Sequence, residues 1–171
     1  IQNARDADPL ADALIAGGLP SAEITFRTDA AEDAIRAMAG RGDITVGAGT
    51  VLSVDQARTA IDAGASFIVA PGLNPKVVRF CLDHKVPITP GVATPTDIET
   101  AMDLGLTLLK YFPAEAFGGL KTLKAMSAPY QAVRFIPTGG LNPGNVAAYL
   151  QFPKVAAVGG SWIVKSAAIA N

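Results

Sequence analysis

The sequence predicts an α/β fold of the (β/α)8 class, the TIM barrel. Seven short apolar runs alternate with seven amphipathic helical stretches, and this order favours parallel βαβ units with right-handed crossovers. Polar or Gly-rich residues follow nearly every apolar run, as they do where a site is assembled from the carboxyl ends of many barrel strands. No G-x-G-x-x-G follows the first run, which argues against a doubly wound dinucleotide-binding sheet.

The expected strands are short and apolar, as in a parallel sheet that helices cover. In chain order they are Ala22–Phe26, Ile44–Gly47, Phe67–Ala70, Val86–Pro90, Leu106–Phe112, Val133–Pro137 and Val155–Val158. The expected helices are Pro9–Gly17, Ala30–Gly40, Val54–Gly64, Pro75–His84, Thr96–Gly105, Gly119–Ser127 and Pro143–Leu150.

Capping residues and glycines mark the ends of these helices. The expected starts are Thr28 or Asp29, Ser53, Asn74, Pro95 or Thr96, and Asn142, and the expected stops are Gly17, Gly40, Gly64 and Gly105.

We expect one domain, residues 1–171, that lacks the first strand and the last helix of the barrel. The chain opens with Ile1-Gln2-Asn3 and a helix, and only Ser161–Asn171 follow the last expected strand. Complete barrels of this class start at about 200 residues.

The composition excludes several classes of function. A net charge of -1 gives no basic footprint for nucleic acid or anionic lipid, and no apolar run approaches the roughly 18 residues of a membrane helix. The one cysteine, Cys81, rules out an intrachain disulfide and is expected to be an inert thiol on the buried side of a helix. With His84 as the only histidine and no Asp/Glu cluster at ligand spacing, we expect no histidine-dependent triad and no metal site. We also expect no cofactor.

Lys110 ends an apolar strand. Apolar neighbours desolvate its ammonium group, which lowers the pKa of the amine and raises its neutral fraction. A neutral amine near a carbonyl substrate is what Schiff-base chemistry requires. The alternative is a structural lysine whose stem covers the barrel mouth while its head reaches water.

Glu23, Thr25 and Arg27 share one face of their strand if side chains alternate along it. A buried carboxylate beside a guanidinium is costly unless it is used or well satisfied. The alternative is a structural ion pair inside the barrel. At the end of the next strand, Gly49 offers close backbone approach and Thr50 a hydroxyl donor.

Two glycine pairs predict a phosphate site. Thr138-Gly139-Gly140 precedes a helix, whose N-terminus favours anions, and Gly159-Gly160-Ser161 repeats the pattern after the next strand. Phosphate commonly binds at the loops after strands seven and eight of such barrels. The alternative is a pair of tight strand-to-helix turns.

Motifs along essentially the whole chain closely resemble the 2-keto-3-deoxy-6-phosphogluconate (KDPG) aldolase family, which also contains 4-hydroxy-2-oxoglutarate (KHG) aldolases. They are Glu23-Ile24-Thr25-Phe26-Arg27-Thr28, Gly47-Ala48-Gly49-Thr50-Val51, Ala70-Pro71-Gly72-Leu73, Thr89-Pro90-Gly91-Val92, Lys110-Tyr111-Phe112-Pro113-Ala114-Glu115, Pro137-Thr138-Gly139-Gly140 and Gly159-Gly160-Ser161-Trp162.

The resemblance implies a role for each matching residue. Lys110 would form the Schiff base and Glu23 would be the general acid/base. The substrate would be bound by Arg27, Thr50, Gly49, Pro71, Phe112 and Thr138, and its phosphate by Gly139, Gly140, Gly160 and Ser161.

The resemblance implies a metal-independent lyase of carbohydrate metabolism, in the Entner-Doudoroff pathway, that splits KDPG into pyruvate and glyceraldehyde 3-phosphate. KHG, split into pyruvate and glyoxylate, is a second expected substrate. The resemblance also implies a homotrimer, and we expect it in the cytoplasm. The alternatives are a phosphate-binding barrel isomerase, in which Glu23 abstracts the proton and Lys110 acts only electrostatically, and a non-catalytic barrel that binds a phosphorylated ligand.

Overall fold

The computed structural model describes residues 1–164, which form two compact units. The first comprises Ile1–Ala70 and Asn74–Ile88, and the second comprises Pro71–Leu73 and residues 89–164. None of the helices in the described part has the length and hydropathy that a bilayer-spanning segment requires. The expectation that Ser161–Asn171 do not form the last helix of the barrel concerns residues that lie mostly outside the described part of the chain.

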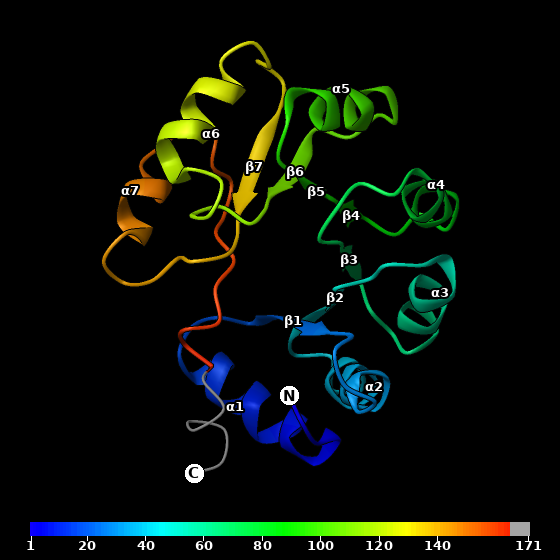
Figure 1. Ribbon diagram of the computed structural model, residues 1–171. Coiled ribbons are helices and arrows are strands. Elements are labelled where there is room, and N and C mark those ends of the chain that lie inside the picture. The colour runs from blue at the N-terminus through cyan, green and yellow to red at the C-terminus, as the bar shows by residue number, and fades with distance from the viewer. Residues whose placement is uncertain (165–171) are drawn as a thin grey trace. The chain divides into compact units, whose positions relative to one another are not determined.

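The first unit alternates helices and parallel strands. In order it contains η1 (Ala4–Asp6), α1 (Ala7–Ala16), β1 (Ser21–Thr25), α2 (Ala31–Arg41), β2 (Thr45–Gly49), α3 (Val54–Asp62), β3 (Phe67–Val69) and α4 (Pro75–Asp83). The sheet order is β1-β2-β3-β4, and in β4 (Ile88–Thr89) only Ile88 belongs to this unit. Figure 1 shows α1 ahead of β1, and α2, α3 and α4 following β1, β2 and β3 in the blue-to-green half of the chain.

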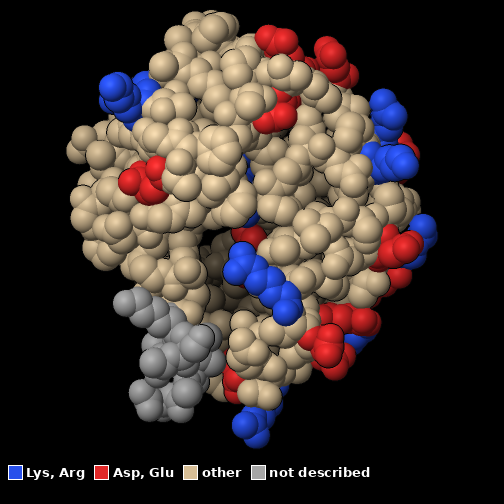
Figure 2. All heavy atoms as spheres, in the orientation of Figure 1, with Lys and Arg blue, Asp and Glu red and all other residues tan. Residues whose placement is uncertain are grey.

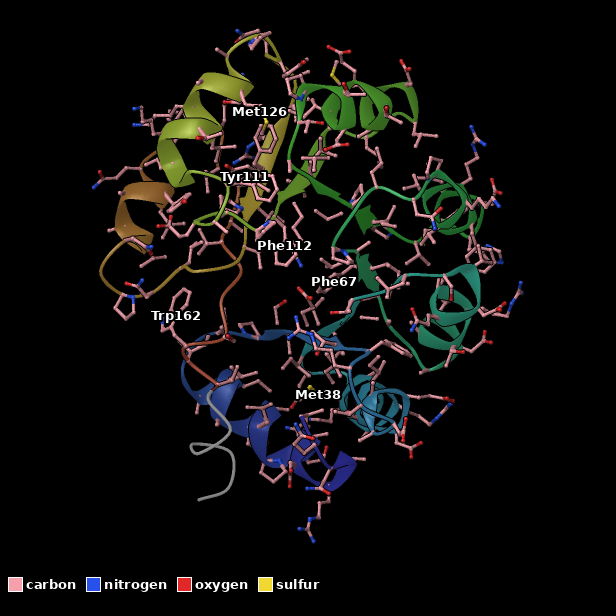
Figure 3. All side chains as sticks on the ribbon, in the orientation of Figure 1. Met38, Phe67, Tyr111, Phe112, Met126 and Trp162 are labelled. Carbon is pink, nitrogen blue, oxygen red and sulfur yellow. The ribbon has the colours of Figure 1, made fainter. Side chains whose placement is uncertain are left out.

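Helix α2 shows how this unit builds its core. Its Ile35 and Met38 are fully buried, and the helix contacts both β1 and β2 (Figures 1 and 3). Burial of such side chains contributes roughly 1.5–3 kcal/mol each. The outer sides of α2, α3 and α4 are charged, with acidic and basic side chains interspersed in Figure 2, as expected for a chain without a basic binding face.

The second unit repeats the alternation. It contains β5 (Gly91–Val92), α5 (Pro95–Asp103), β6 (Leu108–Tyr111), α6 (Gly119–Ser127), β7 (Arg134–Pro137) and α7 (Val146–Leu150), with the parallel sheet order β5-β6-β7. Its core combines fully buried residues from strands and helices: Leu109, Tyr111, Leu123, Phe135 and Tyr149.

The expected strand Val86–Pro90 is shorter and is continued by a further strand segment. The structure has β4 at Ile88–Thr89 and β5 at Gly91–Val92, with Pro90 between them. Proline donates no backbone hydrogen bond and interrupts a ladder. The Pro90 carbonyl nevertheless accepts from the Lys110 N–H at 2.9 Å, so this segment still pairs with β6.

The expected strand Val155–Val158 is wrong as a continuous strand, since only isolated bridges join Phe135 to Val155 and Thr138 to Gly159. Pro137 explains the break, because it lacks the N–H that the next rung requires. Its carbonyl instead accepts from the Gly159 N–H at 2.9 Å, so the pairing slips by one residue.

Several helix ends also differ from the expected ones. Ser53 and Asn74 cap α3 and α4 as predicted. Helix α5 is capped instead by Thr94 in a capping box with Asp97, and α2 continues through Gly40 to a left-handed Gly42. The N-cap position of α2 is Ala30, and that of α7 is Asn145 instead of Asn142.

Candidate active site

Lys110 is buried on β6 and lies beside an aromatic ring. Its residue surface is 6% exposed, and the adjacent Leu109 and Tyr111 are fully buried. Two residues on, the Phe112 ring centroid lies 5.0 Å from the Lys110 Nζ, a cation–π distance. The expectation of a buried lysine at the end of this strand is confirmed, whereas its lowered pKa stays a prediction.

The two faces of β6 have different surroundings. Figure 3 shows Tyr111 on the side toward α6 and Phe112 on the other side of the chain, as the alternation of a strand requires. The Tyr111 hydroxyl donates to the carbonyl oxygen of Phe117 at 2.9 Å. Lys110 shares the Phe112 side, so its amine faces away from the helix-packed core.

Pro71 lies over the strand that pairs with Lys110. Gly91 is the register partner of Lys110 in β5. A methyl group on Gly91 would stand 2.0 Å from the Pro71 carbonyl oxygen, so only glycine allows this close approach. Within the second unit, the Pro71 segment therefore reaches the strand adjacent to the lysine.

The loop Thr138–Gly140 follows β7 and is tied to the turn after β6. The Ala114 N–H donates to the Thr138 carbonyl at 2.9 Å, and the Glu115 N–H donates to the Gly139 carbonyl at 3.1 Å. Gly139 and Gly140 both have positive φ, 99° and 81°, a backbone that other residues rarely adopt. Gly139 also approaches the Phe112 ring, which is 3.4 Å from the position of a methyl group on that glycine.

The second glycine pair lies beside the first. Gly159 forms a bridge with Thr138, and a methyl group on it would stand 2.4 Å from the Thr138 hydroxyl oxygen. The ring of Trp162 covers Gly160 in the same way (Figure 3 labels the tryptophan). Ser161 is exposed between them. The second unit thus brings the two expected phosphate loops together.

Glu23 lies over Gly49 in the first unit. The two residues come from paired strands, β1 and β2. A methyl group on Gly49 would stand 1.8 Å from the Glu23 Oε1, so the carboxylate occupies the space that glycine leaves empty. Two of the residues expected to bind or convert substrate are therefore in direct contact.

Strand β1 ends at Thr25, and Arg27 lies in the turn that follows it. The alternation of side chains along the strand therefore extends to Glu23 and Thr25 only, and the shared face of all three residues stays a prediction. The Arg27 N–H donates to the Thr25 carbonyl at 2.8 Å, which turns the chain at the strand end. The exposed Arg27 lines an open hollow of about 390 Å³ together with Phe26, Thr28, Asp29, Ala31, Glu32 and Gln56.

Thr50 has an unusual backbone. Its φ is 58°, and a β-branched residue in this left-handed region is an outlier that costs of order 1–3 kcal/mol. The surrounding strand ends hold it there, since the following Val51 N–H donates to the Val69 carbonyl at 3.3 Å. Strain of this kind concentrates at binding and catalytic sites.

Sequence reasoning did not assign any role to Glu115 and Tyr149. The Tyr149 hydroxyl donates to the Glu115 Oε1. Burial, and then the hydrogen bond to Glu115, raise the pKa of Tyr149 above its ordinary value. Burial, followed by the same carboxylate, also raises the pKa of Tyr111. The one signal in the sequence was the position of Glu115 in the segment that follows the strand of Lys110, at the end where sites form.

Within residues 1–164 no group of three His, Cys, Asp or Glu side chains is placed to hold a metal ion. The expected site residues divide between the two units. The first unit holds Glu23, Arg27, Gly49 and Thr50, and the second holds Lys110, Pro71, Phe112, Thr138, Gly139, Gly140, Gly160 and Ser161.

The sequence matches known proteins along its length. The family profile described as KDPG and KHG aldolase matches residues 1–171. The 2-dehydro-3-deoxy-phosphogluconate aldolase of Treponema pallidum is 50% identical over 171 residues, which are 99% of this chain and 81% of that protein.

Two solved structures are also similar. KDPG aldolase from Legionella pneumophila, with pyruvate captured at low pH as a covalent carbinolamine intermediate, is 41% identical with a TM-score of 0.97, covering 100% of this chain and 84% of that one. The aldolase of Zymomonas mobilis ZM4 with 3-phosphoglycerate is 43% identical with a TM-score of 0.94, covering 97% and 79%.

These likenesses confirm the α/β barrel class that the sequence predicted. They extend over both units and include every residue range that holds an expected site residue. The chain belongs to the KDPG and KHG aldolase family.

Proposed function

We propose that this chain is a class I aldolase that cleaves KDPG to pyruvate and glyceraldehyde 3-phosphate through a Schiff base on Lys110. The burial of Lys110 beside Phe112 is the observation on which the proposal rests. It is supported by the Legionella relative, in which pyruvate is held as a covalent carbinolamine. Cleavage of KHG to pyruvate and glyoxylate by the same chemistry is included, because the family contains enzymes for both substrates.

The proposed reaction begins with attack of the neutral Lys110 amine on the C2 ketone. The carbinolamine loses water to give an iminium ion, which withdraws electrons from the C3–C4 bond. Removal of the C4 hydroxyl proton then breaks that bond, releasing the aldehyde and leaving an enamine. Protonation of the enamine at C3 and hydrolysis of the imine return the amine and free pyruvate.

Glu23 is the proposed proton carrier in these steps. A carboxylate can remove the C4 hydroxyl proton and return a proton to the enamine, directly or through a water. The exposed Glu23 side chain packs against Gly49, and this contact supports the assignment, since a general base must be held in place to act.

The remaining residues are proposed to bind the two ends of the substrate. Arg27 and Thr50, with the backbone at Gly49, hold the carboxylate, because a guanidinium is the strongest partner for that group. Phe112 and Pro71 line the pocket of the ketone, and Thr138 lies beside the substrate chain. The phosphate binds to Gly139, Gly140, Gly160 and Ser161, two glycine-rich loops that the second unit holds together.

The proposal is tested by steady-state cleavage of KDPG, measured as the rate at which pyruvate is released. The Lys110→Arg variant keeps the positive charge but has no primary amine, and we expect it to lose at least about 10³-fold in kcat. Lys124→Arg is the matched control, because the Lys124 Nζ also lies over an aromatic ring, 5.6 Å from the Phe152 centroid. Equal activity of the wild type and Lys110→Arg would refute a Schiff base at this position.

We also propose a single-domain subunit that assembles as a homotrimer in the cytoplasm. Large apolar side chains exposed on the second unit, among them Phe117, Leu150 and Ile163, support a buried subunit face. The buried free thiol of Cys81 suits a reducing compartment. Light scattering during gel filtration should give about three times the 17.5 kDa of one chain, and a monomer mass would contradict the trimer.

A further inference from the structure

We propose that Tyr149 and Glu115 form a clamp that positions the Gly139–Gly140 loop and thereby sets the preference for phosphorylated substrates. The inference deepens the proposed function and rests on it. Neither residue is assigned to binding or chemistry above, and the clamp acts through the loop instead of touching the reacting atoms.

Glu115 contacts the loop with both its backbone and its side chain. Its N–H donates to the Gly139 carbonyl at 3.1 Å. Its Cβ and Cγ lie 2.6 and 2.7 Å from the position of a methyl group on Gly140. The side chain therefore lies flat over the second glycine, and a shift of Glu115 moves the surface against which the loop rests.

Tyr149 fixes Glu115 from the other side. It is 1% exposed on α7, and its hydroxyl donates to the Glu115 Oε1. Helix α7 follows the glycine loop in the chain, whereas Glu115 lies in the turn after β6. One hydrogen bond thus joins the segments that flank the loop, and hydrogen bonds to an ionised acceptor are the stronger kind.

Tyr111 holds the same turn through a second hydrogen bond. It is fully buried on β6, and its hydroxyl donates to the Phe117 carbonyl at 2.9 Å. The turn that carries Glu115 is therefore anchored at its far end as well. With both ends held, the Tyr149 hydrogen bond decides where the carboxylate points.

The direction of the carboxylate matters for a phosphate ligand. A negative charge close to a bound dianion repels it, and the repulsion grows as the separation shortens. The phenol of Tyr149 holds the carboxylate toward α7 and offsets part of its charge. Without the hydroxyl, the carboxylate swings free beside Gly140, and both repulsion and loosening of the loop weaken phosphate binding.

The effect should be confined to the phosphorylated end of the substrate. The Lys110 amine lies over the Phe112 ring, on the side of β6 opposite to Tyr111, as the alternation of a strand requires. Pyruvate carries no phosphate, so its reaction with the Lys110 amine does not use the phosphate-binding contacts of the glycine loop. A change in the clamp therefore alters the KM for KDPG and leaves the trapping of pyruvate by borohydride unchanged.

The experiment compares Tyr149→Phe with the wild type in two assays. We expect the KM for KDPG to rise about tenfold, the loss of one hydrogen bond to a charged group. The rate of pyruvate trapping at a subsaturating concentration should stay within about twofold. Glu115→Gln keeps an oxygen that can accept the hydrogen bond, so its KM for KDPG should stay close to that of the wild type. Glu115→Ala has no such oxygen, and its KM should rise.

A second tyrosine–glutamate pair provides the matched control. The Tyr130 hydroxyl donates to Glu99 Oε1 at 2.9 Å in the same unit, and neither residue is among the atoms nearest a methyl group on Gly139 or Gly140. Tyr130→Phe removes the same atom and should leave both assays at the wild-type values. The exposed side chain of Glu115 makes its variants suitable if Tyr149→Phe folds poorly.

Several results would overturn the clamp. An unchanged KM for KDPG in Tyr149→Phe and Glu115→Ala would do so, and so would a parallel fall in KDPG cleavage and pyruvate trapping, which indicates a merely structural role. If the wild type neither cleaves KDPG nor traps pyruvate, the proposed function fails instead. In that case, inorganic phosphate titrated against the fluorescence of Trp162, the single tryptophan, still decides the clamp: equal affinity in the wild type and Tyr149→Phe refutes it.

Discussion

Gly49 illustrates, at the scale of single residues, how an absent side chain can determine chemistry. The Glu23 carboxylate occupies the position where any other residue would place its Cβ. We therefore expect Gly49→Ala to displace Glu23 and to lower kcat by about 10²-fold or more, the lower range for loss of a positioned acid/base group. Steady-state cleavage of KDPG measures this effect.

Gly40→Ala is the matched control for that variant. Gly40 lies inside α2, and no atom lies within 4 Å of a methyl group at this position. The change should leave kcat unaltered and raise stability slightly, because alanine favours the helix. If Gly49→Ala keeps full activity, Glu23 either tolerates displacement or has no part in the reaction.

Thr50 is strained in the structure, and the strain is testable. Thr50→Gly removes the steric conflict at φ 58°, so the free energy of unfolding should stay the same or rise by up to about 1 kcal/mol. The KM for KDPG should rise, because the variant lacks the Thr50 hydroxyl that is proposed to hold the substrate carboxylate. A fall in thermal midpoint of several degrees would show that the hydroxyl, and not the backbone, dominates the stability at this position.

Cys81 is the residue whose chemistry the fold suppresses. It is fully buried on α4, and burial raises the pKa of its thiol to about 11. Because the thiolate is the reactive form, we expect almost no reaction with a thiol reagent at pH 8 in the native protein. Full reaction should follow in denaturant. Rapid labelling of the native protein would contradict a buried, inert thiol.

At the scale of elements, Lys154 stabilises the C-terminal end of α6. Its Nζ donates to the carbonyls of Ser127 and Tyr130, and Ser127 is the last residue of α6. A cation at a helix C-terminus is favourable, and the orphan carbonyls there need donors. Lys154→Met should lower the free energy of unfolding by about 1–3 kcal/mol, measured by urea denaturation.

Lys121→Met serves as the comparison for Lys154→Met. Lys121 is exposed on α6, and an exposed substitution of this kind should change stability by less than about 0.5 kcal/mol. Equal stability of the two variants would mean that the Lys154 hydrogen bonds contribute nothing beyond solvent contacts.

The elements could be predicted from the sequence where one signal dominated. Alternation of apolar runs and amphipathic stretches gave each of the seven helices and six of the seven strands within a few residues. Helix α5 shows the limit, since its expected start is Pro95 or Thr96, and the reciprocal hydrogen bonds between Thr94 and Asp97 place the cap at Thr94. The interrupted pairing between β7 and Val155–Val158 arises because Pro137 has no N–H to donate to that segment. The sequence of one strand does not show which segment will pair with it.

At the scale of the whole molecule, family membership follows from motifs that span the chain in order. The expected site residues mostly lie at strand ends, because parallel strands present their carboxyl ends to the same edge. The partners of those residues could not be predicted in the same way. The Glu115–Tyr149 pair joins residues 34 positions apart, and no local pattern marks a contact of that kind.

The Schiff base on Lys110 is best tested by mass spectrometry of the protein treated with pyruvate and borohydride, followed by peptide mapping. Borohydride reduces an imine to a stable secondary amine, so the adduct stays on the residue that formed it. We expect one pyruvyl-reduced adduct on the peptide that contains Lys110, and none in Lys110→Arg. No adduct, or an adduct on a different lysine, would contradict a class I mechanism at Lys110 and would favour an isomerase or a non-catalytic phosphate-binding barrel.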